Sequence, residues 1–381
     1  VPLDLRTGEI YRFPGEPWRR TPLDTLKVVR SLGGDPYLDI YLPEPQFHPD
    51  VTVRNGTCGR SDDGYPLLFT EYHTPAGVLR QVVRETPDWR DERTHQLMGR
   101  RNLGDSVRED WDVHLFDDWN APRYVEAPVK EMADIEKLKY LLRPVEGDAL
   151  ARWREEARVI KEWARAEDVL VRARRTFGAE AGMWLMQFEA FLCATLQEPE
   201  LVEALCRVVV DWQTRRAELA LETGVDVLMH RGYYETPEYF TPETYRRFCR
   251  PVIETFGKMA REAGAVFALQ RSEGNTRQAD LLAEMPIDIL FDVEPGTGGE
   301  DMSLLKRTLS GRTTLWGGVD STAVITRGKV EEIDKAIETA IATCAPGGGF
   351  VIMPVVWVEA DTPFTQVKTA IEAVMRHGRY A

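Results

Sequence analysis

The sequence predicts an α/β protein, a (β/α)8 barrel with an N-terminal extension. Six short apolar runs in the second half of the chain are each followed by a segment with helical periodicity. The runs are continuously apolar rather than alternating, which is typical of strands covered on both faces. No GxGxxG follows any of them, so a dinucleotide-binding sheet lacks its fingerprint. Six βα units in a row therefore favour most of a barrel.

The first 120 residues are expected to form an N-terminal segment that packs on a barrel body of residues 121–381. Residues 21–33 have a helical pattern, with Pro in the first turn and Gly at the end. VTVRNGTC (51–58) and YPLLFTEY (65–72) flank the polar turn SDDG and predict a hairpin. YLDIYL (37–42) is a candidate for one of the two further strands that a closed barrel needs.

The regular half begins near residue 148. Strands are expected at 169–172, 225–229, 265–269, 287–291, 312–316 and 350–353. Helices are expected at 149–167, 183–195, 199–223, 242–263, 276–285, 301–309, 329–344 and 364–377.

Composition narrows the class of function. Hydrophobic residues make up 43% and charged residues 29% of the chain, as in globular proteins with a buried core. The formal charge of −14 argues against nucleic acid or an anionic membrane as the main partner. Five scattered cysteines without a CxxC indicate free thiols in a reducing compartment. No apolar run suggests a secretory signal or a membrane span, so a cytoplasmic location is expected.

Polar and ionisable residues follow the predicted strands, and in a barrel the chemistry lies at the carboxyl ends of the strands. The residues at these ends are Arg172, Arg174 and Arg175, then His230, Arg231, Tyr233, Tyr234 and Glu235, then Gln270, Arg271, Ser272 and Glu273, then Asp292 and Glu294, then Asp320, and finally Trp357, Glu359 and Asp361. Each could equally be a helix cap or a solvated loop residue. Their convergence on one face instead predicts a polar pocket.

The residue types suggest roles in that pocket. Arginine favours bidentate contact with carboxylate or phosphate, so Arg231 and Arg271 are expected to bind an anionic group. His230 is a candidate general acid or base. No pair of His or Cys residues has ligand spacing, and no metal site is expected. A carboxylate site from Glu235, Glu273 and Asp292 stays an alternative.

Four segments of the chain are informative together, namely GVDVLMHRGYYETPEYFTPETYRRFCRPVIETFGKMAREAGAVFALQRSEGN (224–275), PIDILFDVEP, LWGGVDS and GGFVIMPVVWVEADTPFTQVKTAIEAV. They resemble the uroporphyrinogen decarboxylase-like superfamily. The resemblance covers roughly residues 120–381. It implies a (β/α)8 barrel with its pocket at the carboxyl ends of the strands. The superfamily contains uroporphyrinogen decarboxylases and methyltransferases linked to corrinoids or coenzyme M.

The resemblance also shows where this chain departs from both branches. The methyltransferases carry His-x-Cys-Gly and a late Cys as zinc ligands, whereas Arg271, Glu273 and Val355 or Val356 stand at those positions here. Arginine stays protonated and does not ligate zinc. The decarboxylases carry a tyrosine where Phe188 stands and a late histidine that is missing. Arg19-Arg20 and Arg30 lack the decarboxylase context.

The resemblance therefore implies, first, a methyltransferase that moves a methyl group from a small, anionic methylated substrate to a corrinoid protein or tetrahydropterin, with no tightly bound cofactor. A stretch resembling that branch is TEYHTPAGVLR (70–80). The residues expected to handle protons or orient the methyl donor are His230, Glu235 and Glu273. Those expected to bind substrate are Arg231, Tyr233, Tyr234, Gln270, Arg271, Asp292, Glu294, Asp320 and Trp357.

Two alternatives stay open. One is decarboxylation of a tetrapyrrole or another polycarboxylate, with Asp292 or Glu294 pairing with pyrrole N–H groups. The other is a barrel without catalysis that binds a ligand or partner. The resemblance also makes a homodimer plausible.

Overall fold

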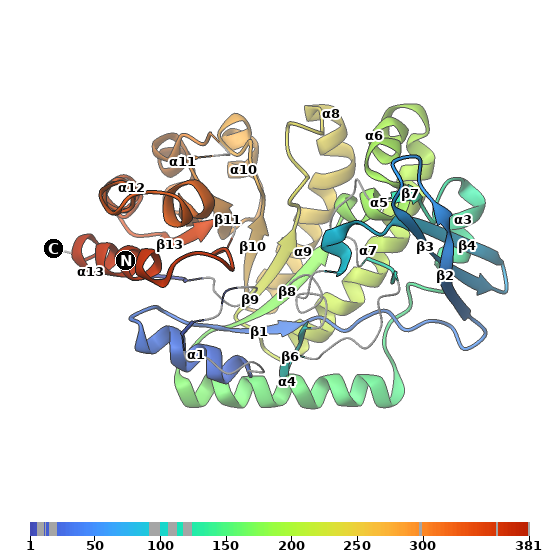
Figure 1. Cartoon of the computed structure of the whole chain (residues 1–381), viewed down its shortest axis with the longest axis horizontal. Helices are drawn as coiled ribbons and strands as arrows, with labels where there is room; N and C mark the ends of the chain where they lie inside the picture. The colour runs from blue at the N-terminus through green and yellow to red at the C-terminus, as the bar shows by residue number, and fades with distance from the viewer. Residues whose placement is uncertain are drawn as a thin grey trace.

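The computed structural model describes residues 1–5, 11, 13–14, 21–90, 100–105, 113–116, 124–296, 299–355 and 357–379. Its centre is a curled sheet of seven parallel strands in the order β1-β8-β9-β10-β11-β12-β13 (Figure 1). The strands are β1 (Leu38–Tyr41), β8 (Val171–Phe177), β9 (Val227–Arg231), β10 (Val266–Gln270), β11 (Ile289–Val293), β12 (Thr314–Asp320) and β13 (Phe350–Val355). All six strands predicted in the regular half are present, and YLDIYL supplies β1.

Two strand ends differ from the prediction. The first predicted strand was expected to end at Arg172, but β8 continues to Phe177, so its arginines lie within the strand. Likewise β12 runs on through Gly317 and Gly318 to Asp320. In both strands the polar side chains can be buried in the sheet because they contact other polar groups of the protein.

The extreme N-terminal residues border the open edges of this sheet. Leu3 forms a parallel bridge with Ile352 of β13, and the Asp4 N–H donates to the Ile352 carbonyl over 3.0 Å. On the other side, the Asp35 N–H donates to the Leu3 carbonyl over 2.7 Å, just before β1 begins. The segment around Leu3 thus hydrogen-bonds both to the last strand and to the entry of the first.

Helices alternate with the strands. They are α1 (Pro22–Ser31), α4 (Gly147–Glu167), α5 (Ala179–Met186), α6 (Phe188–Gln197), α7 (Pro199–Glu222), α8 (Pro242–Thr244), α9 (Arg250–Glu262), α10 (Ala279–Glu284), α11 (Met302–Leu309), α12 (Val330–Cys344) and α13 (Phe364–His377). Short turns of other helix types are η1 (Pro87–Arg90), η3 (Tyr245–Cys249), η4 (Thr276–Gln278) and η5 (Ser321–Thr326).

The helix expected at 242–263 is interrupted. A π-helical stretch, η3, separates α8 from α9. Pro251 explains the interruption, because its ring has no N–H and would clash with the carbonyl four residues earlier in a regular helix. The wider π turn accommodates it.

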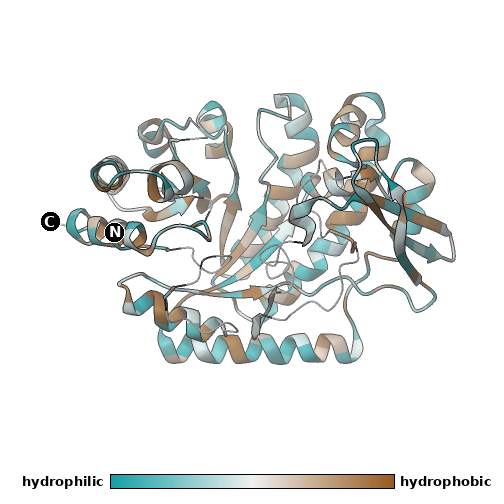
Figure 2. Cartoon of the chain, viewed as in Figure 1, coloured by the Kyte–Doolittle hydropathy of each residue, from teal (hydrophilic) through white to brown (hydrophobic). Residues whose placement is uncertain are grey.

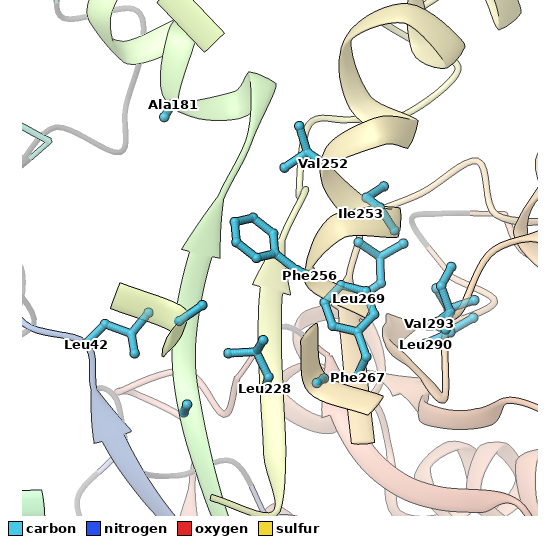
Figure 3. Packing of buried hydrophobic residues seen from close by; sticks show 14 of the residues in the cluster. Leu42, Ala181, Leu228, Val252, Ile253, Phe256, Phe267, Leu269, Leu290 and Val293 are labelled. Carbon is cyan, nitrogen blue, oxygen red and sulfur yellow. The ribbon is translucent and has the colours of Figure 1, made fainter. Parts of the chain in front are cut away.

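The central sheet has two faces, and each strand contributes to both by alternation. One face carries a compact apolar cluster of Val227, Met229, Ala268, Ile289, Phe291, Trp316, Met353 and Val355. The other face carries Leu228, Phe267, Leu269 and Leu290, which pack with Val252, Ile253 and Phe256 of α9 (Figure 3). We call these the inner face and the helix-facing side. Figure 2 shows brown segments in the central strands and teal on the surface of helices such as α4.

A second sheet is built from the N-terminal half. It is antiparallel, in the order β2-β3-β4-β7, with β2 (Thr52–Arg60), β3 (Pro66–Thr74), β4 (Gly77–Arg84) and β7 (Tyr124–Glu126). The predicted hairpin is confirmed, since β2 pairs with β3 around residues 61–64. Helix α3 (Met132–Leu138) contacts both β4 and α7. A two-stranded ribbon pairs β5 (Arg100–Arg101) with β6 (Gly104–Asp105). The domain boundary near residue 120 stays a prediction.

None of the helices in the described part of the chain has the length and hydropathy that a membrane span needs.

Candidate active site

The end of β9 separates two sequence neighbours that were both predicted to act in the pocket. Arg231 follows Val227 and Met229 on the inner face by alternation, whereas His230 follows Leu228 on the helix-facing side. The His230 ring packs 5.5 Å from Phe256 and 6.3 Å from Phe267, measured between ring centroids. The inner face therefore receives Arg231, and His230 lies behind the strand.

The inner face holds a buried ion-pair group at β1 and β8. Arg172 donates from Nε and Nη2 to the two oxygens of Asp39, over 2.8 and 3.0 Å. Arg174 donates from Nη1 to Asp39 Oδ2 over 3.3 Å. Burial works against the charge of Arg172, but the Asp39 carboxylate raises the pKa of that guanidinium above its ordinary value. Arg172 is therefore held as a cation on this face.

Arg231 is surrounded by a carboxylate and aromatic rings. Its Nη1 pairs with Glu180 Oε1, and Glu180 Oε2 accepts the Tyr233 N–H over 2.7 Å. The guanidinium carbon lies 5.1 Å from the rings of Trp184 and Tyr233, and 5.8 Å from that of Tyr234. Such distances allow cation–π attraction. Burial raises the pKa of the Tyr234 phenol, and the nearby Arg231 charge opposes that rise.

The aromatic group continues outward from Tyr234. Phe188 of α6 meets Tyr234 edge to face at 5.6 Å and Tyr239 at 4.9 Å, between centroids. Burial, and next the charge of Glu273, raise the pKa of Tyr239. Glu273 is half-buried at this outer rim rather than in the buried group around Arg231.

The ends of β10, β11 and β12 carry the remaining predicted polar residues. Gln270 Nε2 donates to Asp292 Oδ2 over 2.5 Å, and both residues are buried. Asp292 has a φ of 72°, a conformation that few residues other than glycine adopt. A Cβ placed on Gly296 would lie 2.6 Å from Asp320 Oδ2 and 2.7 Å from Glu294 Oε2. The carboxylates of Glu294 and Asp320 thus approach the same point.

A separate buried group lies on the helix-facing side. His230 Nδ1 lies 3.0 Å from Thr176 Oγ1, and its Nε2 lies 3.7 Å from Glu235 Oε2. Arg271 donates to Gln278 Oε1 over 2.7 Å and lies 5.5 Å from the Tyr245 ring. Burial raises the pKa of the Tyr245 phenol, with Arg271 opposing. His230, Glu235 and Arg271 are each 0% exposed.

The predicted residues thus divide into three sets. Those on or next to the inner face, with carboxylates or rings beside them, are Arg231, Tyr233, Tyr234, Gln270, Asp292, Glu294 and Asp320. Those enclosed behind β9 and β10 are His230, Glu235 and Arg271. Glu273 and Trp357 are half-buried and belong to neither group. The roles assigned to all of them from sequence stay predictions.

Sequence reasoning missed two residues of the inner face. Asp39 lies inside the apolar run of β1, and its charge within that run is the signal that could have identified it. Glu180 lies in the first turn of α5, just after β8. It was overlooked because β8 was expected to end five residues earlier.

The described residues contain no group of three or more His, Cys, Asp or Glu side chains arranged to hold a metal ion. The side chain of Arg271, which the resemblance placed at the position of a zinc-binding histidine, is enclosed beside Tyr245. Val355 is buried at the end of β13, and Val356 lies outside the described residues.

A family model described as "Uroporphyrinogen decarboxylase (URO-D)" matches residues 115–377 of the chain. No curated protein matches this chain in sequence. A solved structure of a methyltransferase from Methanosarcina mazei is similar, with a TM-score of 0.54 and 19% identity over 67% of this chain and 72% of that one. A D-psicose 3-epimerase from Clostridium cellulolyticum H10 is more distant, with a TM-score of 0.39 and 11% identity over 58% of this chain and 82% of that one.

Proposed function

The chain belongs to the uroporphyrinogen decarboxylase (URO-D) family, and on that premise we propose that it is a methyltransferase. It moves a methyl group from a small methylated substrate to a corrinoid protein or a tetrahydropterin. The methyltransferase from Methanosarcina mazei, which shares the fold, supports this branch of the family. The proposal includes an anionic substrate, a cytoplasmic homodimer and a complete (β/α)8 barrel in which the segment around Leu3 takes the eighth strand position.

The observation that carries the substrate class is the surroundings of Arg231. A guanidinium beside three aromatic rings offers a cation and flat apolar surface in one place. An anionic group of the substrate binds the guanidinium, and its apolar part, with the methyl group, lies against the rings. Glu180 fixes the orientation of the guanidinium through its ion pair.

The test uses free cobalamin as the methyl acceptor. The purified protein is mixed under anaerobic conditions with chemically reduced cobalamin and a panel of methylated amines, methyl ethers and methyl thioethers that each carry a carboxylate. Formation of methylcobalamin is followed by its visible spectrum and by chromatography. Wild-type protein is expected to methylate cobalamin with at least one donor. Arg231→Gln is expected to lower kcat/KM by about tenfold to a hundredfold, since one charge-assisted contact is lost.

A matched control keeps this test specific. Arg158 is an exposed arginine of α4 whose contacts are with Glu155 and Glu162 on the same helix. Arg158→Gln is expected to leave the rate unchanged. If no donor supports methylation, or if Arg231→Gln is as active as wild type, the proposal is wrong.

Decarboxylation of a polycarboxylate is the second candidate. The inner face carries Arg172 and Arg174 in addition to Arg231, and several arginines together suit several carboxylates. Incubation with uroporphyrinogen without oxygen, followed by chromatography of the oxidised porphyrins, separates the two candidates. Products with fewer carboxylates would favour decarboxylation.

A further inference from the structure

Glu235 is buried beside the start of α5, and the contacts it makes there are few and specific. Its Oε1 accepts the Glu180 N–H over 3.1 Å. Glu180 is in the first turn of α5, where backbone N–H groups have no partner within the helix. The residue preceding α5, Gly178, has no side chain that could accept these N–H groups. Glu235 therefore supplies the cap of α5 from a different part of the chain.

Two glycines make room for the Glu235 carboxylate. A Cβ on Gly178 would lie 3.1 Å from Glu235 Oε1, and a Cβ on Gly232 would lie 2.9 Å from Glu235 Oε2. Both distances are shorter than ordinary van der Waals contact between carbon and oxygen. Any larger residue at either position would push the carboxylate away from the helix. The local sequence is thus suited to this cap.

Helix α5 carries two of the groups that surround Arg231. Glu180 pairs with the guanidinium, and Trp184, one turn later, stacks its ring at 5.1 Å from it. Residues four apart lie on one face of a helix. Glu180 also accepts the Tyr233 N–H, which holds the loop after β9. The position of α5 therefore sets the position of the Arg231 side chain.

We propose that Glu235 is a positioning residue that caps α5 and, through Glu180, holds Arg231 in its binding geometry. Sequence reasoning had placed Glu235 among the residues that handle protons. Its complete burial behind β9 and its contact with a helix N-terminus favour a role that does not require contact with substrate. The inference rests on the proposed function for one point only, namely that Arg231 binds the substrate.

Amide hydrogen exchange of the whole protein tests the cap without any ligand. Glu235→Leu removes the acceptor, and exchange in α5 (Ala179–Met186) is expected to become about tenfold to a hundredfold faster. Glu235→Gln keeps an acceptor oxygen and is expected to restore most of the protection. Gly178→Ala keeps the Glu235 side chain but pushes its carboxylate away from the helix. Its exchange in α5 is expected to be accelerated as in Glu235→Leu.

Thr236→Val is the matched control. Thr236 is fully buried next to Glu235, yet none of its hydrogen bonds reaches α5 in the described protein. Exchange in α5 is expected to stay unchanged in this variant. Equal acceleration in Thr236→Val and Glu235→Leu would indicate general destabilisation and overturn the proposal. So would unchanged exchange in Glu235→Leu and Gly178→Ala.

Binding of benzoate, measured by calorimetry, connects the cap to Arg231. Benzoate offers a carboxylate and a flat ring, which match the guanidinium and the aromatic group. Glu235→Leu and Glu180→Gln are each expected to weaken binding, and the double variant is expected to be no weaker than Glu180→Gln alone. Additive losses would show that Glu235 does not act through Glu180. If wild-type protein does not bind benzoate, the substrate class fails, while the exchange data still decide whether Glu235 is the cap.

Discussion

Asp39 is the carboxylate whose loss should cost the fold most among the inner-face residues. Its side chain is 17% exposed, while those of Arg172 and Arg174 are 5% and 6% exposed. Two hydrogen bonds from Arg172 end on the two oxygens of Asp39. Asp39→Asn keeps the size of the side chain and removes the charge. It leaves a buried guanidinium without the carboxylate that holds its proton.

The magnitude follows from the cost of an uncompensated buried charge. Breaking a buried ion pair by removing one partner costs about 3 to 5 kcal/mol. For a chain of 381 residues that corresponds to a fall in the melting temperature on the order of 4 to 6 °C. Replacing Arg172 together with Asp39 should cost less, because the guanidinium that makes two hydrogen bonds to Asp39 is then not left buried without it. The double variant Asp39→Asn with Arg172→Met is therefore expected to melt above the single Asp39→Asn variant.

Differential scanning calorimetry at pH 7 measures these changes. The control is Glu155→Gln, which breaks a pair with Arg158 whose side chains are 59% and 54% exposed. That pair lies in water, where the gain from pairing is small. If Asp39→Asn melts within a degree of wild type, or if the double variant melts below it, the view of Asp39 as counter-ion to a buried arginine is refuted.

Three further outcomes are expected. Burial, followed by the charges of Glu235 and Glu203, raises the pKa of the Cys206 thiol to about 12 from 9.0, so the folded protein keeps a proton that the unfolded chain loses. Cys206 should therefore lower stability by about 1.4 kcal/mol per pH unit as the pH rises from 9 towards 12. In urea unfolding, the slope should be shallower by that amount in Cys206→Ala and unchanged in the exposed Cys58→Ala, while Cys249 and Cys344, whose pKa values burial also raises, keep their own contributions. Gly317→Ala should lower the free energy of unfolding in urea by about 3 kcal/mol, because its Cβ would lie 2.1 Å from the Val293 carbonyl oxygen. An unchanged free energy of unfolding would contradict that contact. Arg216→Lys should cost about 2 kcal/mol in the same assay, because lysine cannot reproduce the fork that donates to the carbonyls just after β1.

The positions of most central strands along the chain could be predicted because these strands are apolar on both faces. Strands such as β10 and β11 are covered by helices on one side and by the inner cluster on the other. Their ends were less predictable. Arg172 and Arg174 were predicted to follow the strand, although they lie inside β8. The sequence alone does not show that Asp39 lies opposite them on the neighbouring strand. A charged residue within a strand is compatible with burial only once its partner is known.

The sequence predicted a candidate site at the carboxyl ends of the strands, but it did not show that the residues there divide between two sides of the sheet. His230 and Arg231 are neighbours in sequence, and alternation sends them to opposite faces. Which of them faces inward depends on the register of β9 with β10, and that register cannot be predicted from composition. Tertiary packing also decided the surroundings of Arg231, since Glu180 and Trp184 come from a helix that follows a different strand.

The contact between the two ends of the described chain gives the fold a ring-like connectivity. The ammonium group of Val1 donates to the carbonyl of Gly378 over 2.6 Å, so Val1 lies against the end of α13 (Figure 1). A short linker between them would leave the strand pairing of the central sheet intact. New ends could then be opened at the exposed turn of residues 61–64, which lies between β2 and β3. Such a circular permutant would join the Leu3 segment covalently to α13, so that the sheet is built in a different chain order around the same residues.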